Sequence, residues 1–228
     1  MQIEQSVTTA TPAPAKANPV ALTAIWVGFV GIIVVVIAAA VVQQYRGAAP
    51  FQDPPIYGEV PSFSLTNQTS GTTTLADFAG KTWVIDFVFT RCGGQCPFMS
   101  ARMRELQKWL ESAGHADVKL VSVSVDPEYD TPPVLTEYAK KFEADPNRWT
   151  FLTGEKKFIY PFIQEGFKLG VDDAPAKGES SPEEPIIHSS RFVLMDSKGR
   201  LRGYYDAYDE NDRERLHHDI AFLEKNRD

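Results

Sequence analysis

The longest apolar run of the chain extends from Ala21 to Val42 and is interrupted only by Thr23. It contains no charged residue and no proline. An α-helix rises about 1.5 Å per residue, so a helix of this length would reach about 33 Å, which matches the hydrocarbon core of a bilayer. The pattern therefore predicts one N-terminal transmembrane helix, an anchor over residues 20–42.

A cleaved signal peptide is the alternative interpretation of this run, since Ala38–Ala40 could form a cleavage site. However, the run is longer than a normal signal core and no basic cluster precedes it, which favours a retained anchor. Lys16 and Arg46 stand on opposite sides of the run, so the distribution of positive charge does not decide its orientation.

The segments on either side of the apolar run have a different composition. Residues 1–19 are small and polar with several prolines, and we expect a disordered tail there. Residues 43–60 are rich in proline, glycine and small side chains, which predicts a linker. Residues 61–228 contain no internal repeat and are expected to form a single domain.

Within this domain, strand-like and helix-like spacing of apolar residues alternate. Continuous apolar runs at Trp83–Phe89 and Val118–Val125 predict strands that are covered on both faces. A short strand is expected at Ser62–Leu65, and two further strands on either side of the turn Asp196–Gly199 predict a hairpin. The expected helices cover residues 97–114, 132–142, 156–166 and 211–224, the third of them weakened by Pro161. This order of elements is typical of an α/β thioredoxin-like sandwich.

Composition narrows the classes of function. The chain has 228 residues, 43% of them hydrophobic, which is enough for one domain with a core and an N-terminal appendage. Its formal net charge is −7 and it has no basic cluster. Binding of nucleic acid requires concentrated Lys and Arg, so this class of partner is not expected.

The only two cysteines, Cys92 and Cys96, lie close together rather than spread along the chain. This placement argues against a disulfide-stapled fold and for a local metal or redox site. The pair follows the strongest predicted strand, and Pro97 is expected to open the next helix. The unpaired N–H groups at a helix N-terminus stabilise a thiolate, which is both a nucleophile and a metal ligand. Two of the three intervening residues are glycine, so the loop can turn both sulfurs toward one point.

His188 is the candidate third ligand, because it lies just before the first hairpin strand, where a loop can reach the start of the helix. Taken alone, such a histidine is more often an ordinary loop or core residue. The other histidines, His115, His217 and His218, are expected to be solvated. Two thiolates with one imidazole suit Cu(I) or Cu(II), whereas a structural zinc site would require a fourth ligand. A three-ligand site also leaves an open edge through which an acceptor can take the metal.

These residues resemble the SCO/SenC family of copper proteins. The likeness rests on the C-x-x-x-C-P core of Phe89–Pro97, on Val121–Pro132 with its S-V-D-P-E-Y-D-T stretch, on Pro61–Leu65, and on His188 with the strand after it. It implies a thioredoxin-like domain on the outer side of the cell membrane, held by one anchor, with copper bound by Cys92, Cys96 and His188. The resemblance further implies that the protein delivers copper to, or reduces the thiols of, the copper site in cytochrome c oxidase subunit II or another acceptor.

Two features differ from the family pattern. Gly93–Gln95 replace a proline and an acidic residue of the family loop, and Ile187 stands where the family tends to place an aspartate before the histidine. Both differences predict weaker retention of copper. Asp126 and Asp130 match the family pattern, and we expect them to form a turn and cap the helix around Thr131.

Two alternatives use the same cysteines. A membrane-tethered thiol–disulfide oxidoreductase or redox sensor would cycle Cys92 and Cys96 between dithiol and disulfide, and the glycine-rich loop favours this hypothesis. A peroxidase is less favoured, since the sequence contains no sign of an activated peroxide pocket. An enzymatic role thus depends on whether the pair exchanges disulfides or holds copper.

Overall fold

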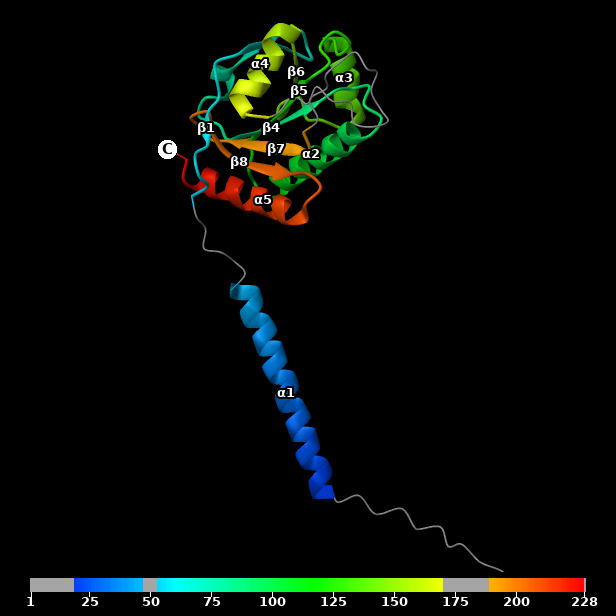
Figure 1. Cartoon of the computed structure of the whole chain (residues 1–228), viewed down its shortest axis with the longest axis vertical. Helices are drawn as coiled ribbons and strands as arrows, with labels where there is room; N and C mark the ends of the chain where they lie inside the picture. Colours follow the sequence, from blue (N-terminus) through cyan, green and yellow to red (C-terminus); the bar gives the residue numbers. More distant parts are fainter. Residues whose placement is uncertain (1–18, 47–52, 170–188, 228) are drawn as a thin grey trace, which may run out of the picture. The chain divides into compact units, whose positions relative to one another are not determined.

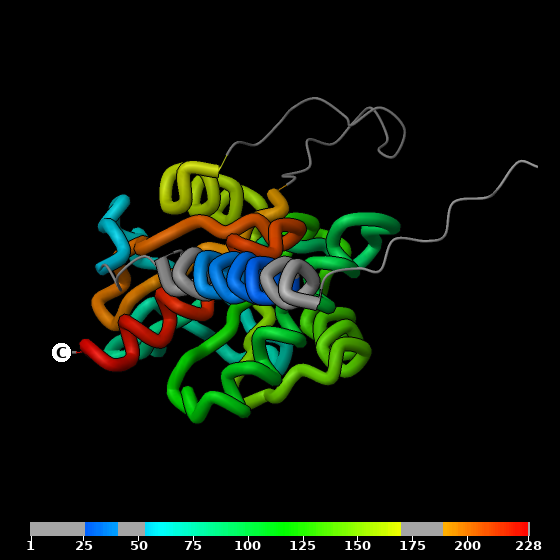
Figure 2. The backbone as a smooth tube through the Cα atoms, turned by 90° about the horizontal axis from the view of Figure 1, so that it is seen from below, coloured from blue at the N-terminus to red at the C-terminus, as the bar shows by residue number. Residues whose placement is uncertain are grey.

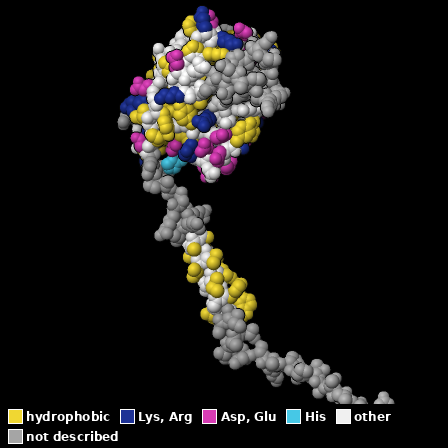
Figure 3. Space-filling view, in the orientation of Figure 1, with side chains coloured by type: hydrophobic (Ala, Val, Ile, Leu, Met, Phe, Trp, Pro, Cys, Tyr) yellow, Lys and Arg dark blue, Asp and Glu magenta, His cyan; other side chains and the backbone are white. Residues whose placement is uncertain are grey.

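The computed structural model describes residues 19–46, 53–169 and 189–227, and the chain divides into two units, Met1–Pro50 and Phe51–Asp228 (Figure 1). In the first unit, a single helix of 28 residues, α1 (Pro19–Arg46), confirms the helix predicted from the apolar run. Large apolar side chains are exposed along it from Trp26 to Ile37 (Figure 3). Within the three described ranges, however, no helix is both long enough and apolar enough to cross a membrane. The prediction of a transmembrane anchor over residues 20–42 is therefore not confirmed.

The second unit is built on one eight-stranded sheet with the order β1-β8-β7-β4-β5-β6-β2-β3. The strands are β1 (Gly58–Glu59), β2 (Ser64–Asn67), β3 (Thr72–Thr74), β4 (Trp83–Val88), β5 (Lys119–Ser124), β6 (Trp149–Thr153), β7 (Arg191–Met195) and β8 (Arg200–Asp206). The helices are the short 3₁₀ helix η1 (Leu75–Phe78), α2 (Gln95–Ser112), α3 (Pro132–Lys141), α4 (Lys156–Phe167) and α5 (Glu210–Lys225). The predicted mixed α/β order is confirmed.

Strands β4, β5 and β6 are parallel at the centre of the sheet, and β7 runs antiparallel beside β4. All six residues of β4 are buried, as its continuous apolar run predicts. Alternate side chains of this strand enter two separate cores: Val84 and Val88 face the side of α2, α3 and α5, whereas Ile85 and Phe87 face the side of α4. Figure 2 shows α4 on one side of the strands, with α2 and α5 on the other.

The helices follow the predicted ranges closely. Helix α2 begins two residues earlier than expected, at Gln95, and the chain leaves it at Gly114, whose φ of +78° favours a residue without a side chain. Helix α4 forms despite Pro161 in its interior. Its apolar face, which includes Ile159 and Ile163, is fully buried, and this burial outweighs the hydrogen bond that the proline removes.

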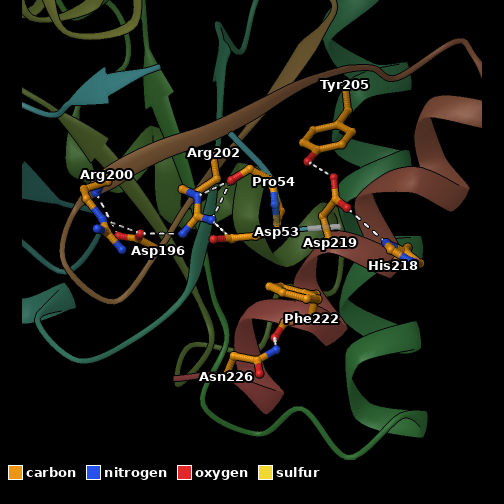
Figure 4. A network of polar contacts seen from close by, with 10 residues as sticks. All are labelled: Asp53, Pro54, Asp196, Arg200, Arg202, Tyr205, His218, Asp219, Phe222 and Asn226. Atoms are coloured by element: carbon orange, nitrogen blue, oxygen red, sulfur yellow. Dashed lines mark hydrogen bonds and ion pairs between the residues drawn. The ribbon is translucent and has the colours of Figure 1, made fainter. Parts of the chain in front are cut away.

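The sheet extends further toward the N-terminus than the sequence indicated. Strand β1 lies inside the predicted linker 43–60 and pairs with β8. Just before it, the carbonyl oxygen of Pro54 accepts hydrogen bonds from the guanidinium of Arg202, which also pairs with Asp53 and Asp196 (Figure 4). Arg202 is 4% exposed, so these partners satisfy a buried charge. This cluster fixes Asp53 and Pro54 beside the turn between β7 and β8.

Candidate functional site at the start of helix α2

The two cysteines lie where β4 passes into α2. Cys92 stands in the connecting loop and is half-buried, whereas Cys96 lies in the first turn of the helix and is 6% exposed. Both are free thiols. The backbone N–H of Cys96 donates a hydrogen bond to the Cys92 sulfur, with a donor–acceptor distance of 3.4 Å. The loop therefore brings one sulfur onto the open N-terminus of the helix, as the sequence predicted.

The two thiols differ strongly in acidity. The hydrogen bond from the Cys96 thiol lowers the pKa of Cys92 to about 5, and the N–H groups of Cys96, Gly94 and Gln95 act in the same direction against the effect of burial. That same thiol–thiolate bond, together with burial, raises the pKa of Cys96 well above its ordinary value. At neutral pH the pair thus consists of one reactive thiolate and one protonated thiol.

The loop before Cys92 is held by the turn that follows β5. The carboxylate of Asp130 accepts hydrogen bonds from the Thr90 N–H at 3.1 Å and from the Thr90 and Ser124 hydroxyls at 2.5 Å each. Burial raises the pKa of Asp130, and these donors oppose that effect. Next to it, the carboxylate of Asp126 accepts two bonds from the Arg91 guanidinium, at 3.0 and 2.6 Å.

This arrangement corrects one sequence prediction. Thr131 is the N-cap of α3, but it makes no side-chain capping bond. Asp126 does begin a backbone turn, since its carbonyl accepts from the N–H of Asp130. The two aspartate side chains, however, bond Thr90 and Arg91 in the loop before Cys92 rather than the start of α3. Sequence spacing could not reveal contacts that join residues 35 and 40 positions apart.

A second buried carboxylate, Asp86, lies in β4. Its Oδ1 accepts from the Ser122 hydroxyl at 2.6 Å, and Ser122 in turn accepts from the Trp149 indole N–H. Its Oδ2 has no hydrogen-bond partner among the described residues. Burial raises the pKa of Asp86 to about 7, and its charge contributes to the raised pKa of Cys96. An acidic residue inside the apolar run Trp83–Val88 was a visible signal of this group that the sequence interpretation did not use.

Aromatic side chains flank the thiols. Phe98, two residues after Cys96, stacks on Tyr208 with ring centroids 4.2 Å apart. The pKa of Tyr208 is raised by burial first, then by Asp206 and by the charges of Cys92 and Cys96, which places this tyrosine near the pair. On the other side, the Arg91 guanidinium lies 4.3 Å from the centre of the Tyr129 ring. Tyr208 and Tyr129 are both exposed, so aromatic rings lie at the surface beside Phe98 and Arg91, which are near the two cysteines in the chain.

The predicted third ligand, His188, lies outside the described residues. The chain resumes at Ser189 and enters β7, which begins beside the end of β4 because the two strands are antiparallel. Among the residues that the structure describes, no group of three or more His, Cys, Asp or Glu side chains could hold a metal ion. The described part of the candidate site is therefore a pair of sulfurs.

Two of the remaining histidines are less solvated than predicted. His217 stacks on Trp109, with ring centroids 4.0 Å apart, and is partly buried. This burial, with a smaller effect of Arg213, lowers the pKa of His217 to about 4. His218 makes a hydrogen bond to Asp219. His217 thus packs on α2 through Trp109, so the prediction that it is simply solvated is wrong, whereas His218 stays partly exposed.

Two thiols in this arrangement support two kinds of chemistry. A thiolate beside a thiol is a soft donor pair that suits Cu(I) once the second proton is released. The same pair can also form a disulfide by losing two electrons and the one proton that Cys96 holds. The described geometry is compatible with both.

Comparisons with known proteins identify the family. The family model for SCO1/SenC matches residues 55–223. A Bacillus subtilis protein named SCO1 protein homolog is 35% identical over 162 residues, which cover 71% of this chain and 80% of the relative. A Stutzerimonas stutzeri relative that is named for copper binding is 27% identical over 148 residues, or 65% of this chain and 69% of the relative.

Two solved structures share the fold. A SCO1/SenC family lipoprotein from Bacillus anthracis is 34% identical and has a TM-score of 0.66, with 75% of this chain and 97% of that chain covered. BsSco, described as a member of the Sco family of cytochrome c oxidase assembly proteins with a disulfide switch, is 34% identical with a TM-score of 0.62, covering 75% and 95%. These likenesses confirm the thioredoxin-like Sco fold predicted for the domain. With the matched residues spanning both cysteines and most of the sheet, this chain belongs to the SCO1/SenC family.

Proposed function

We propose that this protein is a copper-binding assembly factor for cytochrome c oxidase. It would deliver copper to, or reduce the thiols of, the copper site in subunit II or another acceptor. The observation that carries the proposal is the Cys92 sulfur on the N-terminus of α2, with a lowered pKa and with Cys96 beside it. The copper-binding name of the S. stutzeri relative and the assembly role stated for BsSco support it.

The proposed ligands for copper are Cys92, Cys96 and His188. The position of Ser189 supports His188 as a ligand. Ser189 is the next residue along the chain and leads into β7, at the end of the sheet where the loop that carries Cys92 leaves β4. Three ligands can hold Cu(I) or Cu(II) and leave one side of the ion open to an acceptor. Copper would thus enter and leave this site as cargo.

Anaerobic titration of the reduced full chain with Cu(I), in competition with a chromophoric chelator, tests this proposal. We expect one ion per chain, with binding lost in Cys92→Ser and in Cys96→Ser and weakened in His188→Ala. His115→Ala is the matched control and should bind as the unmodified chain does. Equal binding by all four variants would refute the ligand assignment.

A thiol–disulfide oxidoreductase or redox sensor is the second candidate. The two free, adjacent thiols of unequal acidity support it, as does the disulfide switch described for BsSco. A midpoint potential in the range of exchange proteins, about −120 to −270 mV, together with no stable copper complex would favour this role over copper delivery.

We also infer that the N-terminal unit attaches the chain to the outer side of the cell membrane, with residues 1–19 as a tail and 20–42 as the attachment helix. The linker predicted over 43–60 is shorter at its C-terminal end, because Asp53, Pro54 and β1 belong to the folded unit before 61–228. The apolar side chains exposed along α1 and the lipoprotein nature of the B. anthracis relative support this inference. The full chain should sediment with membranes and resist a carbonate wash, whereas a chain that begins at Asp53 should not. Equal distribution of the two would contradict attachment by this unit.

A further inference from the structure

We propose that Asp130 is a positioning residue that holds Cys92 at the start of α2 through Thr90. The expected effect on copper binding rests on the proposed function. The expected effect on the reactivity of Cys92 does not. Asp130 is fully buried although it lies in the connection between β5 and α3. Burial of a carboxylate costs free energy unless several donors bond it. The donors of Asp130 therefore indicate which segments it fixes in place.

The donors of this carboxylate can be assigned individually. The Ser124 hydroxyl accepts the N–H of Asp126, which leaves its own hydrogen for Asp130 Oδ2. The Thr90 hydroxyl donates to Oδ1, and the Thr90 N–H donates to both oxygens, at 3.1 and 3.4 Å. The side-chain hydrogen bonds of Asp130 therefore run either to the end of β5 or to Thr90. Both polar groups of Thr90 that can donate are used in this way.

Thr90 is the nearest residue before Cys92 whose side chain bonds a fully buried partner, and the Cys92 N–H also bonds the Phe89 carbonyl at 3.3 Å. Upstream, the end of β4 is tied to β5 by the bond from Val125 N–H to the Val88 carbonyl. Downstream of Cys92 come Gly93 and Gly94, which have no side chains to anchor the loop. Arg91 is bound by Asp126, but the arginine of this pair is largely exposed and the pair is expected to add little. On its upstream side the Cys92 sulfur therefore depends on Thr90, while the N–H of Cys96 holds it from the downstream side.

The test compares four variants of the full chain in the reduced state. Thr90→Val removes only the hydroxyl, Thr90→Ser restores it, and Asp130→Asn replaces the carboxylate. Thr136→Val is the matched control, because the Thr136 hydroxyl also bonds a distant group, the Gln68 carbonyl, from a partly buried site away from the thiols. The readouts are the alkylation rate of Cys92, mapped by mass spectrometry at about pH 6, the Cu(I) affinity, and the urea midpoint.

We expect Thr90→Val and Asp130→Asn to slow alkylation of Cys92 and to weaken Cu(I) binding by about tenfold, the size typical of lost support behind a metal ligand. Thr90→Ser should stay within about twofold of the unmodified chain, because its hydroxyl can still donate. Thr136→Val should lower the urea midpoint, because it removes a donor from the Gln68 carbonyl, and leave Cys92 unchanged.

Two results would overturn the inference. One is an unchanged alkylation rate of Cys92 in Thr90→Val. This result would overturn the inference even if Asp130→Asn does not fold. The other is an equal loss in Thr136→Val, which would make the effect one of general stability. If the unmodified chain itself does not retain Cu(I), the proposed function fails, while the alkylation rates still decide the role of Asp130.

Discussion

The two ends of the sheet are built on different principles. At the end where β7 turns into β8, the carboxylate of Asp196 accepts from Arg202 and Arg200 and from two backbone N–H groups, and Arg202 is in turn satisfied by Asp53 and Pro54. At the end where β4 leaves for α2, Asp86 keeps an oxygen with no partner among the described residues, and a thiol of raised pKa is buried. Paired charges stabilise the turn at one end, whereas at the other end two buried groups that resist ionisation, Asp86 and Cys96, lie near the reactive thiolate of Cys92.

The largest expected effect comes from the paired end. Arg202→Met should destabilise the domain by about 3 kcal/mol, because it leaves Asp196 buried with a reduced set of partners and frees the Pro54 carbonyl. Urea unfolding measures this loss. The alkylation rate of Cys92 should not change, and a parallel change in that rate would show that the two ends are coupled.

The second effect concerns Asp86 and depends on pH. Because its pKa is raised from 3.8 to about 7, the folded state holds this proton more tightly than the unfolded chain does. Its contribution to stability is therefore complete below about pH 4 and is lost as the pH rises to about 7, at about 1.4 kcal/mol per unit.

Urea unfolding at about pH 5 and about pH 8 should show this loss as a difference of about 2–3 kcal/mol between the unmodified chain and Asp86→Asn, which cannot ionise. Cys92 and His217, whose pKa values are lowered, change the stability in the opposite direction over this range, but they do so in both chains. Asp196→Asn is the control and should keep the Asp86-dependent loss. Identical pH profiles for the unmodified chain and Asp86→Asn would contradict the assignment.

The smallest effect sharpens the contrast between the two thiols. With a pKa of about 5, Cys92 is a thiolate throughout neutral pH, so its alkylation rate should be flat there and fall by half near pH 5. At about pH 6 it should react about tenfold faster than an ordinary exposed cysteine, because its thiolate fraction is about three-hundredfold higher and the lower nucleophilicity of a thiolate with a low pKa offsets only part of this gain. Cys96 should remain almost unreactive until the protein unfolds. Equal rates for both thiols would remove the asymmetry on which the site depends.

Much of this architecture could be predicted from local patterns. Burial is visible in the continuous apolar run of β4 and in the three- and four-residue spacing of apolar side chains in α2. The turn before β8 is visible in its turn-forming residues. Each element lies close to its expected range. The short strands β1 and β3 could not be predicted in this way, because they are polar or are formed only by pairing with a neighbour.

For the site, the sequence predicted the cysteines but not the side chains that support them. The sulfurs and their helix followed from spacing, since a loop of three residues constrains both cysteines. The supporting side chains of Asp130 and Asp126 did not, because their partners are distant in sequence. Asp86 stood out as an acid in an apolar strand, but only the fold shows that Ser122 and Trp149 lie beside it. His188 remains a prediction.

The placement of Asp53 against Arg202 has one last consequence, for reach. Strand β4 has six residues and so separates its two ends by about 20 Å, at about 3.3 Å per residue. Asp53, where the described part of the folded unit begins, therefore lies at the opposite end of the sheet from the sulfurs. In the proposed function, an acceptor would reach the sulfurs at the end of the sheet that does not carry Asp53.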